Sequence, residues 1–229
     1  MSRLSLSATG VELLDDPGAD PAVVAQSLRN IARANRWFGG LAAVRYGLGR
    51  VLRDMPPGRI TMLDIGTGMG DVPAMVRRWG RSRGLDVEPV GIERHRAAAR
   101  LAADSHLPMA LGCGGDLPVR SRSVDVVVVS QLAHHLDDDG CRVLFLECDR
   151  VARRGVVVAD LHRSRAATAG FWLGARLLRF DRVTIADGLT SIRRGFTAAE
   201  LRARLRHAGI EGEVAHRPGA RVVATWRTT

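Results

Sequence analysis

The residues most suggestive of chemistry form a glycine turn between an apolar run and a helical pattern. Residues 63–71 read LDIGTGMGD, with glycines at positions 66, 68 and 70. Glycines at such a place adopt positive φ and let a ligand approach the amides at a helix N-terminus. Nicotinamide enzymes use a related loop, so the glycines by themselves leave the ligand open.

Carboxylates around this turn narrow the choice of ligand. Asp64 precedes the first glycine by two residues, and Asp71 stands where the dinucleotide fingerprint has its last glycine. Carboxylates there would repel a pyrophosphate, whereas they suit a ligand that carries an ammonium and a sulfonium group. The next apolar run, 87–92, ends in Glu93, which can accept hydrogen bonds from both hydroxyls of a ribose. The pair of acids is more specific than either one.

Histidines follow two later apolar runs. His134 and His135 come after residues 124–129, and His162 comes after residues 156–159. A histidine at the carboxyl edge of a sheet can take a proton from a phenol or an enol, because its pKa lies near the working pH. The alternative is structural, with the first two packed under the loop or bonded to the backbone and His162 on a surface loop. We expect His134 and His135 as candidate bases and His162 in the acceptor pocket.

The elements that must position these residues alternate along the chain. Short runs that are apolar throughout are separated by helical patterns, which indicates a parallel sheet covered on both faces. The capping box Thr197 to Glu200 opens a helix, and two final strands form a hairpin joined at residues 217–219. We predict an α/β doubly wound, Rossmann-like, seven-stranded and mostly parallel sheet with an antiparallel last strand. The expected strands are 60–65, 87–92, 109–111, 124–129, 156–159, 212–215 and 221–226, and the helices between them are 72–79, 96–103 and 140–151.

Two helical additions flank this core. N-terminal helices are expected at 21–34 and 41–52, so we divide the chain into a helical cap, 1–55, and a main domain, 56–229. An insertion at about 164–195 with an apolar helical pattern is a candidate lid. Aromatic pairs occur in both additions, which is consistent with a roofed, apolar acceptor pocket, although plain packing of the added helices on the core is the more economical interpretation. The candidate pocket residues are Trp37, Phe38, Phe171 and Trp172.

From about residue 35 to the C-terminus, the motifs together resemble the class I S-adenosylmethionine-dependent methyltransferases. The resemblance rests on the glycine turn, on Glu93, on GGDLP at 114–118 and on the apolar strand followed by SQLAHH at 130–135. Within that superfamily the chain looks closest to the small-molecule branch that includes the ubiquinone and menaquinone methyltransferases. One departure is Cys113, which stands where family members usually carry an acid.

The resemblance implies a role for each part of the cofactor site. Asp64, Gly66, Thr67 and Gly68 would hold the methionine part, Glu93 with Arg94 the ribose, Gly115, Asp116 and Leu117 the adenine, and Ser130 and Gln131 the underside of the cofactor. Arg36 is predicted to pair with the methionine carboxylate, with an ordinary exposed arginine as the alternative. The expected activity is methyl transfer to oxygen or carbon of a small aromatic, quinone-like or polyketide-type metabolite.

Two rival functions stay open. The formal charge of +10 suggests an rRNA or tRNA methyltransferase, but all 34 basic residues are arginines spread along the chain, and clustering is what marks a nucleic-acid face. Residues 130–133 also lack the Asn/Asp-Pro-Pro-Tyr sequence typical of base amino-group methylation. The second rival is a protein that binds the cofactor without catalysis. The sequence determines neither the identity of the acceptor nor whether the chain forms a homodimer.

The composition and the sequence patterns also indicate the cellular location and whether a metal is expected. No run approaches the roughly 18 apolar residues of a membrane span, and the N-terminus lacks a secretory pattern, so a cytoplasmic protein is expected. The three cysteines form no C-x-x-C pair and are read as reduced. We expect no metal, because the acids at 137–139 near the histidines have a ready role as caps of the following helix.

Overall fold

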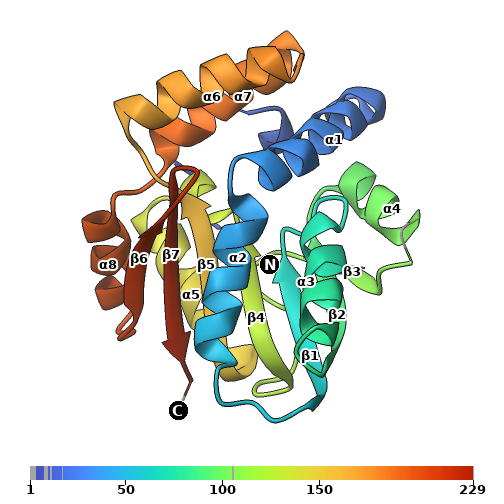
Figure 1. Cartoon of the computed structure of the whole chain (residues 1–229), viewed down its shortest axis with the longest axis vertical. Coiled ribbons are helices and arrows are strands. Elements are labelled where there is room, and N and C mark those ends of the chain that lie inside the picture. Colours follow the sequence, from blue (N-terminus) through green and yellow to red (C-terminus); the bar gives the residue numbers. More distant parts are fainter. Residues whose placement is uncertain (1–3, 8–9, 11, 17, 105, 229) are drawn as a thin grey trace.

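The computed structural model describes residues 4–7, 10, 12–16, 18–104 and 106–228, and within them the chain forms a seven-stranded sheet (Figure 1). The strand order is β3-β2-β1-β4-β5-β7-β6. The strands are β1 (Gly58–Ile65), β2 (Leu85–Glu93), β3 (Met109–Leu111), β4 (Val124–Ser130), β5 (Ala152–Leu161), β6 (Glu213–Arg217) and β7 (Arg221–Arg227). Pairs among β1 to β5 are parallel, and β7 is antiparallel to both of its neighbours. The predicted α/β doubly wound sheet is confirmed.

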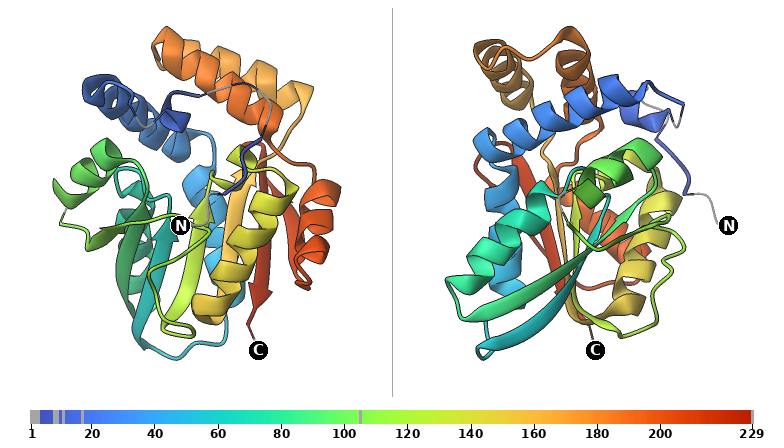
Figure 2. Two further views of the ribbon diagram at one scale, coloured as in Figure 1. Left: turned by 180° about the vertical axis from the view of Figure 1, so that it is seen from behind. Right: turned by 90° about the vertical axis from the view of Figure 1, so that its right-hand side faces the viewer.

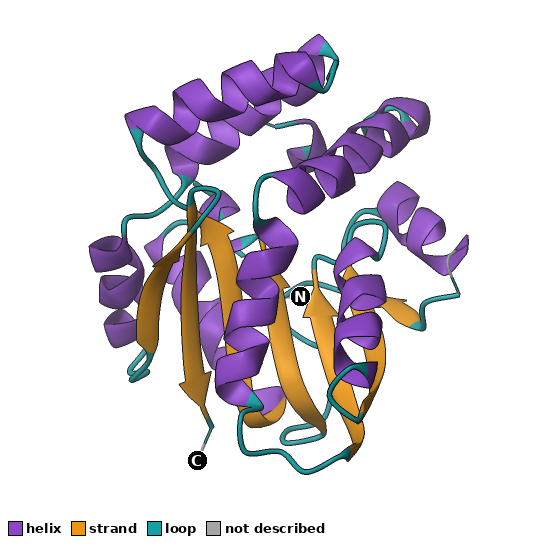
Figure 3. Ribbon diagram, viewed as in Figure 1, coloured by secondary structure: helices purple, strands orange, loops and turns teal. Residues whose placement is uncertain are grey.

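Helices cover both faces of this sheet (Figure 3). The helices are α1 (Pro21–Trp37), α2 (Gly40–Val51), α3 (Asp71–Arg81), α4 (Arg96–Asp104), α5 (Asp138–Val151), α6 (Arg165–Leu177), α7 (Arg182–Arg194) and α8 (Ala198–His207). One core cluster joins α5 and α8 to the sheet, and a second joins α2 and α3 to the opposite face. The central strands are therefore buried on both sides, which explains why β4 is valine at four successive positions.

The two layers differ in how they pack. In the first, Phe145 of α5 meets the ring of Trp226 of β7 edge-on with 5.9 Å between centroids, and both side chains are buried. In the second, α2 lies so close to β5 that a Cβ at Gly47 would stand 2.3 Å from Val157, and Trp79 of α3 is buried. Since α2 shares a core with the strands, the predicted division at residue 55 runs through packed side chains, and it stays a prediction.

The predicted helix caps are present. Asp137 is the N-cap of α5 and accepts from the amide of Gly140, while Thr197 and Glu200 form the capping box of α8. Each cap satisfies amide groups that the first turn of a helix leaves without a partner. These local signals fix where the two helices of one layer begin.

Three helices lie across the carboxyl edge of the parallel strands (Figure 2). They are α1 and the antiparallel pair α6 and α7, which occupies the expected lid insertion. The expected lid insertion contains two helices, because α6 ends at Leu177 and Asp181 caps α7 by accepting from the amide of Thr184. These helices roof the edge where ligands of doubly wound folds bind.

Among the described residues, no helix combines the length and the hydropathy that a membrane span requires.

Candidate active site

The glycine turn connects β1 to α3 at the carboxyl edge. Gly66, Gly68 and Gly70 have φ values of 73°, 56° and 82°, which residues with a side chain rarely adopt. The amide of Gly66 donates to the carbonyl of Ile92 at 2.8 Å, so the turn is held against the end of β2. Gly70 directly precedes α3, and the turn thus presents the N-terminus of that helix to the edge.

Acidic side chains surround the turn, and burial destabilises their ionised forms. The carboxylate of Asp64 is 2% exposed and accepts a hydrogen bond from the Thr67 hydroxyl at 2.7 Å. Burial first, and then the charges of Asp71 and Glu93, raise the pKa of Asp64 to about 8. Burial also raises the pKa of Asp71. A cationic ligand would relieve both effects, since an opposite charge favours the ionised carboxylate.

Glu93 ends β2 beside the same turn. Its Oε2 accepts from the amide of Gly68 at 3.0 Å, and its Oε1 accepts from the amides of Arg94 at 2.8 Å and His95 at 2.9 Å. A carboxylate has about four acceptor positions, so one is left for a ligand hydroxyl in this arrangement. The predicted bond to two ribose hydroxyls requires a second position to be released, and it stays a prediction.

A chain of buried and half-buried polar side chains runs from the turn to the last strand. The amide of Asn35 at the end of α1 donates to Oδ2 of Asp71 at 2.9 Å, and Gln131 donates to Asn35. Arg221 of β7 donates to Oε1 of Gln131 at 2.9 Å. Burial lowers the pKa of Arg221 to about 10. Gln131 has a φ of 52°, a backbone strain of the kind that gathers at functional sites.

The other predicted cofactor residues are spread around this centre. Arg36 is exposed, and its neighbour Asn35 is the residue that reaches the turn. Ser130 is half-buried at the end of β4. Arg94 is exposed and donates to the carbonyl of Leu14 at 3.3 Å. Their assigned roles stay predictions.

The loop predicted to hold the adenine is partly committed to the core. Gly115 is buried beneath Leu4, and Leu117 belongs to the core cluster of α5. The amide of Leu117 donates to Glu147 at 2.9 Å. Asp116 is exposed, so its carboxylate is the part of this loop that is open to a ligand.

His134 forms a buried pair with the end of β5. Its Nδ1 lies 2.6 Å from Oδ1 of Asp160, and the exposed fractions of the two side chains are 2% and 0%. Burial raises the pKa of Asp160, but the charge and hydrogen bond of His134 outweigh it and leave that pKa below its usual value. The carboxylate fixes the ring so that Nε2 points away from β5, which is the orientation of a base held by an acid.

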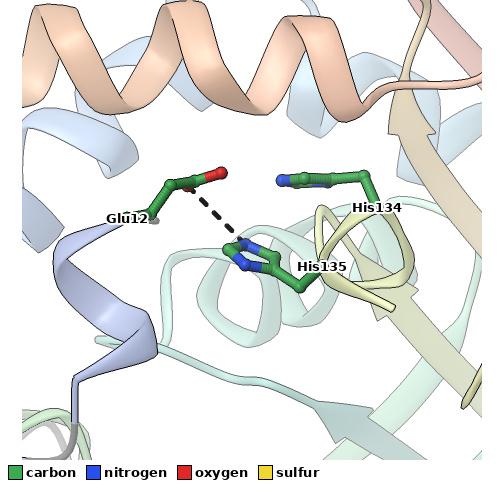
Figure 4. Close-up of side chains that lie close together, drawn as sticks. All are labelled: Glu12, His134 and His135. Carbon is green, nitrogen blue, oxygen red and sulfur yellow. Dashed lines mark ion pairs between the residues drawn. The ribbon is translucent and has the colours of Figure 1, made fainter. Parts of the chain in front are cut away.

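His135 meets the N-terminal segment. Its Nδ1 lies 2.9 Å from Oδ1 of Asp15, and its Nε2 lies 3.8 Å from Oε2 of Glu12 (Figure 4). Arg194 at the end of α7 donates to Oε1 of Glu12 at 3.0 Å and to Oδ2 of Asp15 at 3.1 Å. Segments far apart in the sequence thus meet over the end of β4.

The remaining predicted acceptor residues divide into two groups. The rings of Phe38 and Phe171 lie 5.6 Å apart and join α1 to α6, whereas Trp37 and Trp172 are 68% and 43% exposed. His162 is half-buried, with Nδ1 3.1 Å from the carbonyl of Phe196 and its ring against His216. The structure brings the two phenylalanines together and places His162 nearer to the last hairpin.

A cleft of about 540 Å³ opens beside His134. Its wall is charged and includes Arg163, Arg193, Arg194 and Arg204 together with the acids that precede and begin α5. Most of these arginines have acidic partners, as Arg163 has in Glu200 and Arg204 has in Asp138. The predicted apolar pocket is therefore not this cleft, and its existence stays a prediction.

Several residues of the site escaped the sequence prediction. Asn35 could have been found from the sequence, because it continues the helical spacing of Val24, Leu28 and Ile31. A polar residue at that spacing lies on the buried face of the helix. Asp160 carries the same signal as Asp64, since it is an acid at the end of an apolar strand. Glu12, Asp15 and Arg194 are linked only through the folded chain.

Comparisons with known proteins agree with this architecture. Residues 63–159 match a family described as a methyltransferase domain. No curated protein matches the sequence.

Solved structures with this fold include three examples of distant sequence. A SAM-dependent methyltransferase from Aquifex aeolicus is 15% identical, with a TM-score of 0.60 over 92% of this chain and 99% of its own. Human N-acetylserotonin methyltransferase in complex with SAM is 13% identical, with a TM-score of 0.62 over 91% of this chain and 56% of its own. Magnesium protoporphyrin IX methyltransferase from Synechocystis PCC 6803, with bound SAH, is 11% identical, with a TM-score of 0.56 over 90% of this chain and 87% of its own.

Proposed function

We propose that this chain, whose residues 63–159 match a methyltransferase domain, is an S-adenosylmethionine-dependent methyltransferase that methylates oxygen or carbon of a small aromatic, quinone-like or polyketide-type metabolite. The observation that carries the cofactor part is the group of buried acids at the glycine turn. Burial and the neighbouring charges of Asp71 and Glu93 raise the pKa of Asp64 to about 8, so a positive charge beside these acids would stabilise their ionised forms. An ammonium and a sulfonium group supply that charge.

S-adenosylmethionine, when bound, supplies a methyl group on a sulfonium. Displacement at that carbon is in line, so most of the acceleration can come from holding the acceptor in place and from excluding water. The helices α1, α6 and α7 provide the roof for this purpose. Asn30 of α1 donates to Asp181 at 2.7 Å, and Arg33 donates to the carbonyl of Leu178 at 2.7 Å, so the roof is tied together at the loop between α6 and α7.

A phenol or enol acceptor must also lose a proton. His134 is the candidate base, because Asp160 holds its Nδ1 and leaves Nε2 directed toward the roofed side. As the new bond to the methyl carbon forms and the bond to sulfur breaks, the acceptor proton would pass to Nε2. His135, stacked on His134 with 4.4 Å between ring centroids, is the second candidate.

The direct experiment uses labelled S-adenosylmethionine with metabolite extracts and with panels of hydroxyquinones, phenols and polyketides. We expect labelled product from one class of acceptor. We also expect S-adenosylhomocysteine to inhibit the formation of that product. Cofactor binding without methyl transfer to any component would favour a binding protein. Tight RNA binding with a steep salt dependence and label in RNA would favour the nucleic-acid rival.

A further inference from the structure

Three metal-ligating side chains converge between the N-terminal segment and the end of β4. They are Glu12, His134 and His135, and one ligand atom of each lies within 4.8 Å of the others (Figure 4). Glu12 is 7% exposed and His134 is 2% exposed, so the cluster is shielded from water. One carboxylate and two imidazoles form a donor set that suits divalent first-row transition metals.

Each imidazole is oriented by a carboxylate on its far side. Asp160 lies 2.6 Å from Nδ1 of His134, and Asp15 lies 2.9 Å from Nδ1 of His135, where the guanidinium group of Arg194 also stands at 3.1 Å. Metal-bound histidines almost always donate their other N–H to a carboxylate, a carbonyl or water, which fixes the tautomer and makes the ligating nitrogen more basic. Both histidines therefore turn Nε2 toward Glu12 with the arrangement that a metal ligand needs.

The Nε2 atom of His134 has no hydrogen-bond partner among the described residues although it is buried. With the proton on Nδ1 and donated to Asp160, Nε2 holds a lone pair that faces the carboxylate of Glu12. Two acceptors directed at one another repel, and a buried polar atom without a partner costs free energy. A cation between them removes both penalties.

The charge around the cluster points the same way. Three carboxylates, those of Glu12, Asp15 and Asp160, lie against the two imidazoles, and the guanidinium group of Arg194 contacts Glu12, Asp15 and Nδ1 of His135. A divalent ion would add positive charge where the carboxylate of Glu12 faces the two Nε2 atoms.

We propose that Glu12, His134 and His135 bind one divalent transition-metal ion, with Zn²⁺ as the representative ion. Ligand atoms on a tetrahedral Zn²⁺ stand roughly 3.4 Å apart, so the side chains need to move together by about 1 Å. The sequence analysis expected no metal, and this proposal differs from it because Glu12 lies far from the histidines in the chain and meets them only in the folded structure. The ion would fasten the N-terminal segment to the sheet edge, and it would occupy the lone pair of Nε2 that the proposed function gives to the acceptor proton, so His134 can act as the base only in the metal-free chain.

The test measures metal binding directly, so it does not depend on the proposed methyl transfer. The full chain is freed of metal with a chelator and titrated with Co²⁺, whose visible absorption reports coordination, and then with Zn²⁺ by calorimetry. We expect one ion per chain, displacement of Co²⁺ by Zn²⁺, and a higher Tm in the presence of Zn²⁺.

Substitutions locate the ion. Glu12→Gln and His135→Gln should weaken binding by at least 100-fold and abolish the Zn²⁺-dependent rise in Tm, and Asp15→Asn should weaken it by 10- to 100-fold. Circular dichroism of the metal-free variants separates lost ligands from lost folding. His216→Gln is the matched control, because His216 and His162 form the other histidine pair, and it should bind as wild type.

Two results would overturn the proposal. One is a wild-type chain that binds neither Co²⁺ nor Zn²⁺ below millimolar concentration. The other is binding that survives in the folded Glu12→Gln and His135→Gln variants or disappears in His216→Gln, which would place the ion elsewhere. If methyl transfer falls in His135→Gln while metal affinity is unchanged, the histidine is a base, and the metal site is wrong while the proposed function stands.

Discussion

Replacing Asp64 by asparagine should make the protein more stable while it weakens cofactor binding. The side chain is 2% exposed, and burial together with Asp71 and Glu93 raises its pKa from 3.8 to about 8. Asparagine has nearly the same shape, and its carbonyl oxygen can still accept the hydroxyl of Thr67. The substitution therefore removes the charge and leaves the packing in place.

The size of the effect follows from proton linkage. Because the folded pKa lies above the unfolded value, the folded chain binds the extra proton between about pH 4 and pH 8, and wild-type stability falls as pH rises through that window. For pKa values of 3.8 and about 8, the loss between pH 5 and pH 8.5 amounts to about 4 kcal/mol. Asp64→Asn cannot bind this proton. The difference between its free energy of unfolding and that of wild type should therefore increase by about 4 kcal/mol from pH 5 to pH 8.5.

Urea unfolding at pH 5 and pH 8.5 measures this difference, because subtracting the two proteins cancels the titrating groups that do not interact with Asp64. Asp116→Asn is the control, since Asp116 is exposed, and it should stay within about 0.5 kcal/mol of wild type at both pH values. Calorimetry should show S-adenosylmethionine binding at least tenfold more weakly to Asp64→Asn. A stability advantage that does not change with pH, or an unchanged cofactor affinity, would refute the reasoning.

Three further predictions concern the cofactor, the roof and a helix cap. Glu93→Gln should weaken S-adenosylmethionine binding by tenfold or more in calorimetry, and unchanged affinity would remove Glu93 from the ribose site. Phe171→Ala should lower the unfolding free energy by about 2 to 4 kcal/mol in urea by breaking the contact with Phe38, whereas the exposed Trp172→Ala should cost less than half as much. Thr197→Ala should cost about 1 kcal/mol in the same assay, and no loss would mean that the capping box does not stabilise α8.

The fold was predictable because its signals are local. Apolar runs of strand length, the glycine turn and the capping box of Thr197 each specify their own element, and the order of those elements determines the doubly wound sheet. The split of the lid was also readable, since Asp181 is a strong N-cap residue three positions before Thr184.

Site residues could be predicted only where a local pattern, such as an acid at the end of an apolar strand, marks them. Asp64 and Glu93 each end a strand, so topology alone brings them to one edge. Glu12 lies in a polar stretch without periodicity, and only the folding of α7 against that stretch brings Arg194 to it. Asn35 shows a related difficulty, because the sequence analysis considered its charged neighbour Arg36 and gave no role to the neutral residue on the buried helical face, which contacts Asp71.

The tryptophans of this chain are divided between its interior and its roof. Trp79 and Trp226 are buried in the two core layers, whereas Trp37 and Trp172 are exposed on α1 and α6. Emission from the inner pair should be blue and insensitive to acrylamide, and emission from the outer pair should be red and readily quenched. One cuvette therefore contains separate optical reporters for global unfolding and for events at the roof, so an aromatic acceptor can be screened by quenching before its product is known.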